Sequence, residues 1–289
     1  MASQQLKQFK QEQVRLSKKR LKTSYPRELT IVAEGDSWFA YPLRKDIIDY
    51  LIRKGYAIDK YAKAGDTLEN MVYGTEIKRR GNKVWNEGAI SLQKTLNSIR
   101  KHKPKIVLFS AGGNDIVGSE ILGYLNHNVS NPDDLLNKDI FQARLKEMKT
   151  AIEFFIKSVR TTHVDCNILM DGYDYAKVNG KGYNFIFRNI RGPWLLPSFG
   201  MKGITQKEDH EEIIKYLVDE FNEMLIDLAA QYERFHHIDL RGKFPNDSQW
   251  DNEIHLKNSG YREIANIYHQ KITEIINDDP VKTFRHLIV

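Results

Sequence analysis

Two short runs of consecutive apolar residues constrain the fold of this chain most strongly. They occupy residues 31–33 and 106–109, and each is followed closely by a glycine turn with polar side chains, Gly-Asp-Ser at 35–37 and Gly-Gly-Asn-Asp at 112–115. A strand that is covered on both faces needs continuous apolar residues instead of alternating ones, which is the pattern of buried strands in parallel sheets. The chain is therefore predicted to contain a parallel sheet whose strands end in polar turns.

Helical and strand patterns alternate along the rest of the chain. The strongest helical pattern has Phe141, Leu145, Met148 and Ile152 on one face, three or four residues apart. Further helices are predicted at 46–54, 67–73, 87–101, 214–228 and 261–275, and further strands at 56–62, 167–171 and 237–240. This alternation predicts a three-layer α/β/α sandwich around a mainly parallel sheet, as in flavodoxin-like folds.

The pattern indicates one domain with two additions. Residues 1–28 are polar and basic, and we expect them to form an N-terminal extension of a domain that spans 29–289. Residues 177–204 form an insertion that is rich in aromatic residues and has no helical or strand period. Long loops of this kind commonly cover substrates, and the alternative is a loop that only packs against the core.

The charge of the chain narrows its choice of partners. The 289 residues carry a formal net charge of +6, which favours anionic lipid, nucleic acid or an acidic substrate. Residues 78–83 are predicted to form a basic exposed loop without interleaved aromatic residues, whereas single-stranded nucleic acid is usually bound by bases stacking on such residues. Nucleic acid is therefore not an expected partner, whereas an anionic membrane surface is compatible with the charge.

The cysteine content and the hydropathy bear on the compartment. Cys166 is the only cysteine, so an intrachain disulfide is excluded, and its place beside the apolar run 168–170 predicts a buried structural thiol. No run approaches the roughly 18 apolar residues of a membrane span, and the first residues lack the apolar region of a signal peptide. We therefore expect a cytoplasmic protein, with export by a dedicated secretion system as the alternative.

Four residues that could take part in catalysis either follow predicted strands or precede the last helix. They are Ser37, Gly65, Asn114 and His255. In an open α/β sheet, ligands bind outside the carboxyl ends of the strands, so these residues are expected to lie close together. The alternative is that Gly-Asp-Ser is only a turn and that Asn114 only satisfies local backbone groups. A serine becomes nucleophilic when a base takes its proton, and an imidazole suits that role at neutral pH.

The four blocks resemble the SGNH (GDSL-type) hydrolase family. They read Gly-Asp-Ser-Trp at 35–38, Gly65, Gly-Gly-Asn-Asp at 112–115 and His255, and the resemblance extends from residue 29 to about residue 276. It implies an acyl-serine intermediate on Ser37 with His255 as the base. It also implies an oxyanion hole formed by the backbone N–H groups of Ser37 and Gly65 and the side-chain amide of Asn114, with no metal or organic cofactor.

The sequence departs from the family at the residue that orients the histidine. The family has an aspartate three residues before the histidine, and this chain has Asn252 there, preceded by Asp251. An asparagine can orient an imidazole, but it does not stabilise the imidazolium as a carboxylate does. Three arrangements are open: Asp251 turns toward His255, Asn252 orients the imidazole less effectively than an aspartate would, or Ser37 and His255 act as a dyad. We favour Asp251.

The predicted function is hydrolysis of a carboxylic ester of the lipase or esterase type. Trp38, Phe39 and Tyr41 beside the nucleophile, together with Trp194 in the insertion, are predicted to bind an apolar acyl group, so lipid is a candidate substrate. Two alternatives are a carbohydrate O-deacetylase and a catalytically silent domain that binds a ligand or partner. The chain has no Gly-x-Ser-x-Gly elbow, P-loop, dinucleotide fingerprint or metal-site spacing of histidines.

Overall fold

A computed structural model describes residues 30–42, 44–185 and 188–277, so the predicted extension at 1–28 lies outside the described residues. At its centre is a sheet of five parallel strands in the order β2-β1-β5-β6-β9. The strands are β1 (Ile31–Gly35), β2 (Ile58–Lys60), β5 (Ile106–Ser110), β6 (Asn167–Asp171) and β9 (Phe235–Ile238). Strands β1 and β5 are buried along their whole length, which explains the consecutive apolar residues at 31–33 and 106–109.

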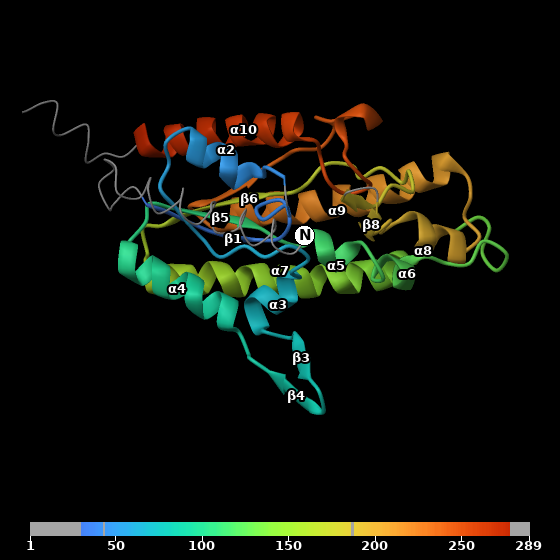
Figure 1. The fold of residues 1–289 in the computed structure, drawn as a ribbon, viewed down its shortest axis with the longest axis horizontal. Helices are drawn as coiled ribbons and strands as arrows, with labels where there is room; N and C mark the ends of the chain where they lie inside the picture. The colour runs from blue at the N-terminus through green and yellow to red at the C-terminus, as the bar shows by residue number, and fades with distance from the viewer. Residues whose placement is uncertain (1–29, 43, 186–187, 278–289) are drawn as a thin grey trace, which may run out of the picture.

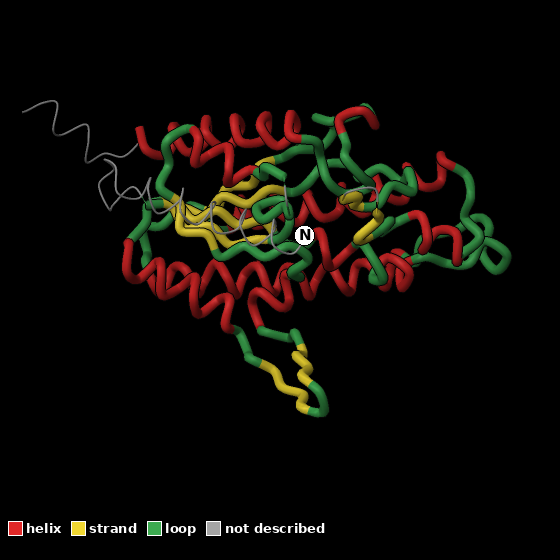
Figure 2. Tube along the Cα trace, viewed as in Figure 1, coloured by secondary structure: helices red, strands yellow, loops and turns green. Residues whose placement is uncertain are grey.

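Helices cover both faces of this sheet (Figures 1 and 2). One face carries two helices that pack on each other, α2 (Ile47–Arg53) and α10 (Asn258–Asn277). The other face carries α3 (Leu68–Tyr73), α4 (Ile90–His102), α7 (Lys138–Thr162) and α9 (Lys207–Gln231). The predicted three-layer α/β/α sandwich with a mainly parallel sheet is confirmed.

The core lies between the sheet and these helices. The predicted face of α7, including Phe141, Met148 and Ile152, is buried, and the ring of Phe155 stacks on Phe109 of β5 with centroids 4.0 Å apart. Cys166 is also fully buried, as predicted, and this burial raises the pKa of its thiol to about 12. It is therefore a packing residue and not a reactive thiol.

Two segments are more regular than their sequences predicted. The basic segment predicted as a loop is part of an antiparallel hairpin, β3 (Ile77–Arg80) and β4 (Lys83–Asn86), which projects from the domain (Figure 1). The insertion at 177–204 contains a second hairpin, β7 (Tyr183–Phe185) and β8 (Arg188–Arg191), and a short helix, α8 (Leu196–Met201). The β3–β4 hairpin buries no residue of its strands, so it does not show the alternation that predicts a half-buried strand.

Shorter elements complete the chain. They are the helices α5 (Gly113–Ile116) and α6 (Ile121–Tyr124) and the 3₁₀ turn η2 (Asp247–Gln249). Helix α5 begins at the turn after β5 and brings the Gly-Gly-Asn-Asp block to the carboxyl edge of the sheet. Among the described residues, no helix has the length and apolarity needed to cross a membrane.

Candidate active site

Ser37 lies in the turn that follows β1, and the side chain of Asp36 closes this turn. The Asp36 backbone N–H donates to the Ser110 carbonyl at 3.0 Å, and its Oδ1 accepts from the Trp38 N–H at 2.8 Å. A short Asx turn of this kind explains why Asp stands before the serine. The Ser37 side chain is thereby held at the carboxyl edge of the sheet, where it is 6% exposed.

His255 contacts Ser37 directly from the loop that precedes α10. Its Nε2 lies 2.7 Å from the Ser37 Oγ. Its ring stacks on the ring of Tyr41, with centroids 4.4 Å apart and planes 15° apart, and the indole of Trp194 contacts it edge to face at 5.5 Å. Burial lowers the pKa of His255 to about 3, so the imidazole is neutral and its Nε2 can accept the serine proton.

Asn252 is the residue that contacts the other nitrogen of the imidazole. Its Oδ1 lies 2.9 Å from His255 Nδ1 and also accepts from the backbone N–H groups of Ile254 and His255. Because backbone N–H groups are obligate donors, they fix the oxygen on this side of the amide, and Nδ1 must then carry the imidazole proton. Nε2 is therefore left as the acceptor for Ser37.

Asp251 contacts different groups. Its Oδ1 forms an ion pair with Arg44 at 3.0 Å, and its Oδ2 accepts from the Tyr41 hydroxyl at 2.7 Å. The sequence-based preference for Asp251 over Asn252 as the direct partner of His255 therefore does not agree with the observed contacts. A backbone hydrogen bond from the Asp251 N–H to the His255 carbonyl, at 2.8 Å, directs this side chain away from the imidazole.

Of the predicted oxyanion residues, Asn114 lines the same pocket as Ser37. The Asn114 Nδ2 is 3.4 Å from the Asp36 Oδ2 and donates to the Asp66 carbonyl at 2.9 Å. Gly65 has a φ of +76°, in the left-handed region that favours glycine. Asp115 fixes the two segments together, because its Oδ2 accepts from the Leu68 N–H at 2.7 Å at the start of α3.

A largely apolar pocket opens beside these groups. Ser37, Asn114 and Gly113 form part of its wall, and the rest comes from helices and loops on the carboxyl side of the sheet. Its apolar walls are Trp38, Ile116, Val117, Tyr173, Ala176, Val218, Phe221, Trp250 and Ile254. Such a lining removes apolar groups from water and offers a neutral alkyl or acyl chain a favourable environment.

The four residues predicted to bind substrate have different environments. Trp38 lines the pocket, and its Nε1 donates to the Ile254 carbonyl at 3.1 Å. Phe39 is fully buried against Tyr268 in the core and does not line this pocket, so its predicted substrate contact does not agree with the structure. Tyr41 stacks on His255, and Trp194 is half-buried on the same imidazole.

Glu253 connects the histidine loop to the insertion, and sequence reasoning missed it. This buried carboxylate accepts four backbone N–H groups: that of Gly180 and those of the consecutive residues 194–196, the segment that leads into α8. Backbone groups at the start of a helix lack partners within the helix, and a carboxylate satisfies them well. No spacing or motif distinguishes this glutamate from an exposed one, so the sequence carried no signal for it.

The described residues contain no group of three or more His, Cys, Asp or Glu side chains that could hold a metal ion. Three other histidines bond to neighbouring polar groups: His210 to the Ile204 carbonyl, His236 to the Asn167 Oδ1, and His237 to the Asn222 Oδ1 at 2.9 Å. The site thus consists of a hydroxyl, an imidazole, amide donors and an apolar pocket.

This fold and this site define a class of protein: a parallel α/β domain with a serine and a histidine in contact at the carboxyl edge of its sheet, an arrangement that suits nucleophilic chemistry. The family is more specific. Residues 35–268 match the GDSL-like Lipase/Acylhydrolase family, and the chain belongs to it. Ester hydrolysis is the reaction of this family.

One solved structure agrees with the fold at low sequence identity, and a second is similar at a lower TM-score. The lipase Lip_vut3 from a goat rumen metagenome is 12% identical, with a TM-score of 0.51 over 84% of this chain and 96% of that chain. A family 3 carbohydrate esterase of Clostridium thermocellum is 15% identical, with a TM-score of 0.47 over 86% and 98%. No match was found among curated proteins.

Proposed function

We propose that this chain is a serine esterase that forms an acyl-enzyme on Ser37. The observation that carries the proposal is the 2.7 Å contact between the Ser37 Oγ and His255 Nε2 at the mouth of an apolar pocket. His255 takes the hydroxyl proton while the Oγ attacks the ester carbonyl. The imidazolium then gives that proton to the leaving alcohol, and water repeats the sequence to release the acid.

Negative charge develops on the carbonyl oxygen during each attack. We assign its stabilisation to the backbone N–H groups of Ser37 and Gly65 and to the amide of Asn114. Donors that are already fixed before the reaction need no reorganisation when the charge appears. The hydrogen bond of Asn114 to the Asp66 carbonyl supports this assignment, because it holds the amide with one N–H and leaves the second N–H, whose contact with Asp36 Oδ2 is long at 3.4 Å, as the donor to the oxyanion.

The apolar pocket favours an ester whose acyl group is an alkyl chain. Ile116, Val218 and Phe221 would surround such a chain, and a single buried CH₂ contributes about 0.8 kcal/mol. A carbohydrate deacetylase removes only an acetyl group and has little use for this lining. We therefore assign the lipase or esterase type ahead of the deacetylase type.

The test is hydrolysis of p-nitrophenyl esters from acetate to long acyl chains by the wild type and by Ser37→Ala. Activity that disappears in the variant and rises with chain length supports the proposal. A preference for acetate points to the deacetylase. A folded wild type that hydrolyses no ester and whose Ser37 is not labelled by a fluorophosphonate refutes the enzyme and favours the silent binding domain.

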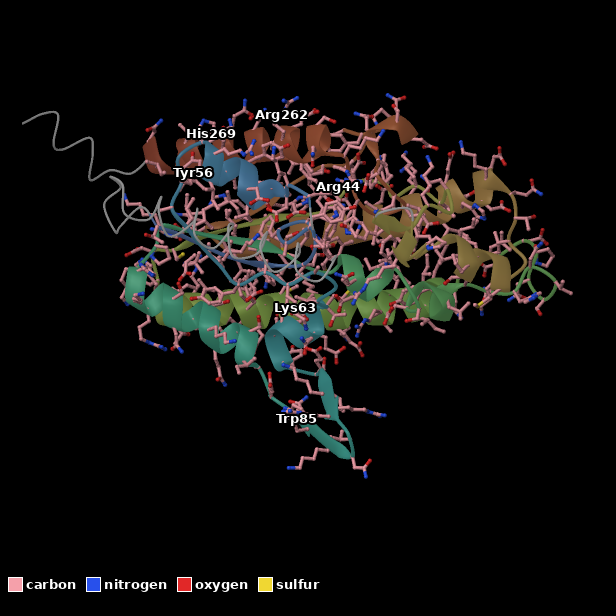
Figure 3. The ribbon with its side chains drawn as sticks, viewed as in Figure 1. Arg44, Tyr56, Lys63, Trp85, Arg262 and His269 are labelled. Atoms are coloured by element: carbon pink, nitrogen blue, oxygen red, sulfur yellow. The ribbon has the colours of Figure 1, made fainter. Side chains whose placement is uncertain are left out.

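We also propose that the β3–β4 hairpin contacts an anionic lipid surface, where an esterase would meet its substrate. Between residues 77 and 86 it carries four basic residues and no acidic one, and Ile77, Val84 and Trp85 are 60%, 57% and 40% exposed. Figure 3 shows Trp85 on this projecting hairpin, on the side of the domain away from Arg262. Basic groups near an anionic membrane contribute about 1 kcal/mol each, and tryptophan favours the interface.

Sedimentation with phosphatidylserine vesicles tests this contact. We expect the triple variant Arg79→Glu, Arg80→Glu, Lys83→Glu to bind at least 100-fold more weakly, while hydrolysis of a water-soluble ester is unchanged. Equal vesicle binding by both proteins contradicts the proposal. Binding to single-stranded nucleic acid in place of vesicles also contradicts it.

A further inference from the structure

Among the described residues, no carboxylate contacts the histidine directly, but the carboxylate of Asp251 is connected to it through three hydrogen bonds. The Asn252 Nδ2 donates to the Tyr41 hydroxyl at 3.0 Å, and that hydroxyl donates to the Asp251 Oδ2 at 2.7 Å. Together with the Asn252 Oδ1 on His255, these bonds form a continuous chain from Asp251 to the imidazole. Arg44 holds the far end of the chain through its ion pair with Asp251.

The direction of every proton in this chain is fixed. The Asn252 amide presents its oxygen to two backbone N–H groups, so its nitrogen must face Tyr41. The Tyr41 hydroxyl, which accepts from that nitrogen, must give its own proton to the Asp251 carboxylate. Hydrogen bonds aligned in one direction polarise one another, so the charge of Asp251 increases the negative charge on the Asn252 oxygen that faces His255.

Tyr41 also contacts the imidazole with its ring. The phenol lies nearly parallel to the His255 ring, and its hydroxyl is bound to a carboxylate. When the imidazole takes the Ser37 proton, its positive charge lies over the face of this ring, which attracts cations. One residue therefore fixes the plane of the imidazole and connects Asn252 to a negative charge.

We propose that Tyr41 and Asp251 are positioning residues that together replace the aspartate absent at residue 252. They hold the Asn252–His255 pair in line with Ser37 and stabilise the imidazolium through the amide of Asn252. The proposal rests on the serine-esterase function proposed above. It gives a role to Asp251 that requires no contact with the histidine.

The decisive experiment exchanges the two residues. In Asn252→Asp the Tyr41 hydroxyl faces two carboxylates and can donate to only one, so one carboxylate oxygen loses its hydrogen-bond donor. In Asp251→Asn the shape is kept and the charge is lost. In the double exchange, Asp251→Asn with Asn252→Asp, the Tyr41 hydroxyl again lies between one amide donor and one carboxylate acceptor. The series of hydrogen bonds that ends at His255 then contains a carboxylate once more.

The rate at which a fluorophosphonate labels Ser37 measures nucleophile activation without knowledge of the natural ester. We expect about tenfold slower labelling in each single variant, the size of one lost hydrogen bond of about 1.4 kcal/mol. The double exchange should regain the wild-type rate or exceed it, with kcat following and KM unchanged on p-nitrophenyl acetate. Rates that simply multiply in the double variant show independent sites and overturn the proposal.

Tyr41→Phe separates the two contacts of the tyrosine, because it keeps the ring on His255 and removes the hydroxyl. It should slow labelling about tenfold, whereas Tyr183→Phe, which removes the neighbouring hydroxyl that donates to the Pro42 carbonyl, should leave the rate unchanged. Equal rates for both variants overturn the proposal. A wild type that the probe does not label refutes the esterase itself, which distinguishes the two failures.

Discussion

Replacing Glu253 by glutamine tests how the insertion is held against the site. The carboxylate has an oxygen for each pair of N–H donors: Oε1 accepts from Gly180 and Leu196, and Oε2 accepts from Trp194 and Leu195. Glutamine keeps one oxygen and presents an NH₂ group to the other pair. Two charge-assisted hydrogen bonds are then lost at a residue with no exposure.

The expected loss follows from the value of such bonds. Each hydrogen bond to a charged group contributes about 1.5–3 kcal/mol, so two contribute about 3–6 kcal/mol. The insertion contacts the site through Trp194 and forms no part of the central sheet, so we expect a local opening instead of global unfolding. At about 1.4 kcal/mol per factor of ten, the amides at 194–196 should lose about 10²- to 10⁴-fold protection from hydrogen exchange.

Hydrogen exchange followed by mass spectrometry measures this directly, and ester hydrolysis measures its consequence. Because Trp194 packs on His255, kcat/KM should fall in the same variant. Glu263→Gln, at an exposed position on α10, is the matched control and should change neither quantity. Unchanged protection at 194–196, or an equal loss in the central strands, would refute this account of the insertion.

Three further outcomes are expected. Asn114→Ala should lower kcat about 10²- to 10³-fold with little change in KM, since it removes one oxyanion donor; an equal kcat would exclude Asn114 from that role. Because burial lowers the pKa of His255 to about 3, its NMR signals should not titrate between pH 8 and 5, where an ordinary imidazole of pKa about 6.5 becomes almost fully protonated. In the unfolded chain His255 does bind a proton over this range. The contribution of neutral His255 to the stability of the fold is therefore lost as the pH falls from about 6.5 toward 3. A midpoint above pH 5 contradicts this. Gly74→Ala should lower the free energy of unfolding, measured by urea titration, by about 2–6 kcal/mol, because a Cβ there would lie 1.8 Å from the Gly88 carbonyl carbon. The control is Gly81→Ala, which is also at positive φ but has open space around it and should lose much less stability. Equal losses in the two variants would exclude the collision as the cause.

The central sheet was predictable because its two inner strands are each specified by a short stretch of neighbouring residues. Strands with two covered faces must be continuously apolar, and residues 31–33 and 106–109 therefore identified β1 and β5. The last strand, predicted at 237–240, lies at Phe235–Ile238, because an edge strand with half-buried histidines has no such signal. The β3–β4 hairpin depends on cross-strand pairing, which short basic sequences do not reveal.

The site was predictable as far as its residues follow strand ends. Ser37, Asn114 and His255 could be singled out because the carboxyl edge of a parallel sheet collects them. The sequence does not show whether Asp251 or Asn252 contacts His255. Arg44 and Tyr41 decide this, because both bind the Asp251 carboxylate and hold it away from the imidazole. The position of Arg44 depends in turn on a loop whose conformation only the whole fold determines.

The β3–β4 hairpin leaves and rejoins the domain at Gly74 and Gly88, whose backbones nearly touch. Asn86 closes this junction by donating to the Gly74 carbonyl at 2.6 Å. A segment whose two ends coincide can be lengthened, shortened or exchanged during evolution without moving the helices on either side, α3 and α4. The surface proposed to contact lipid can therefore change in length and sequence without any change in the residues at the carboxyl edge of the sheet.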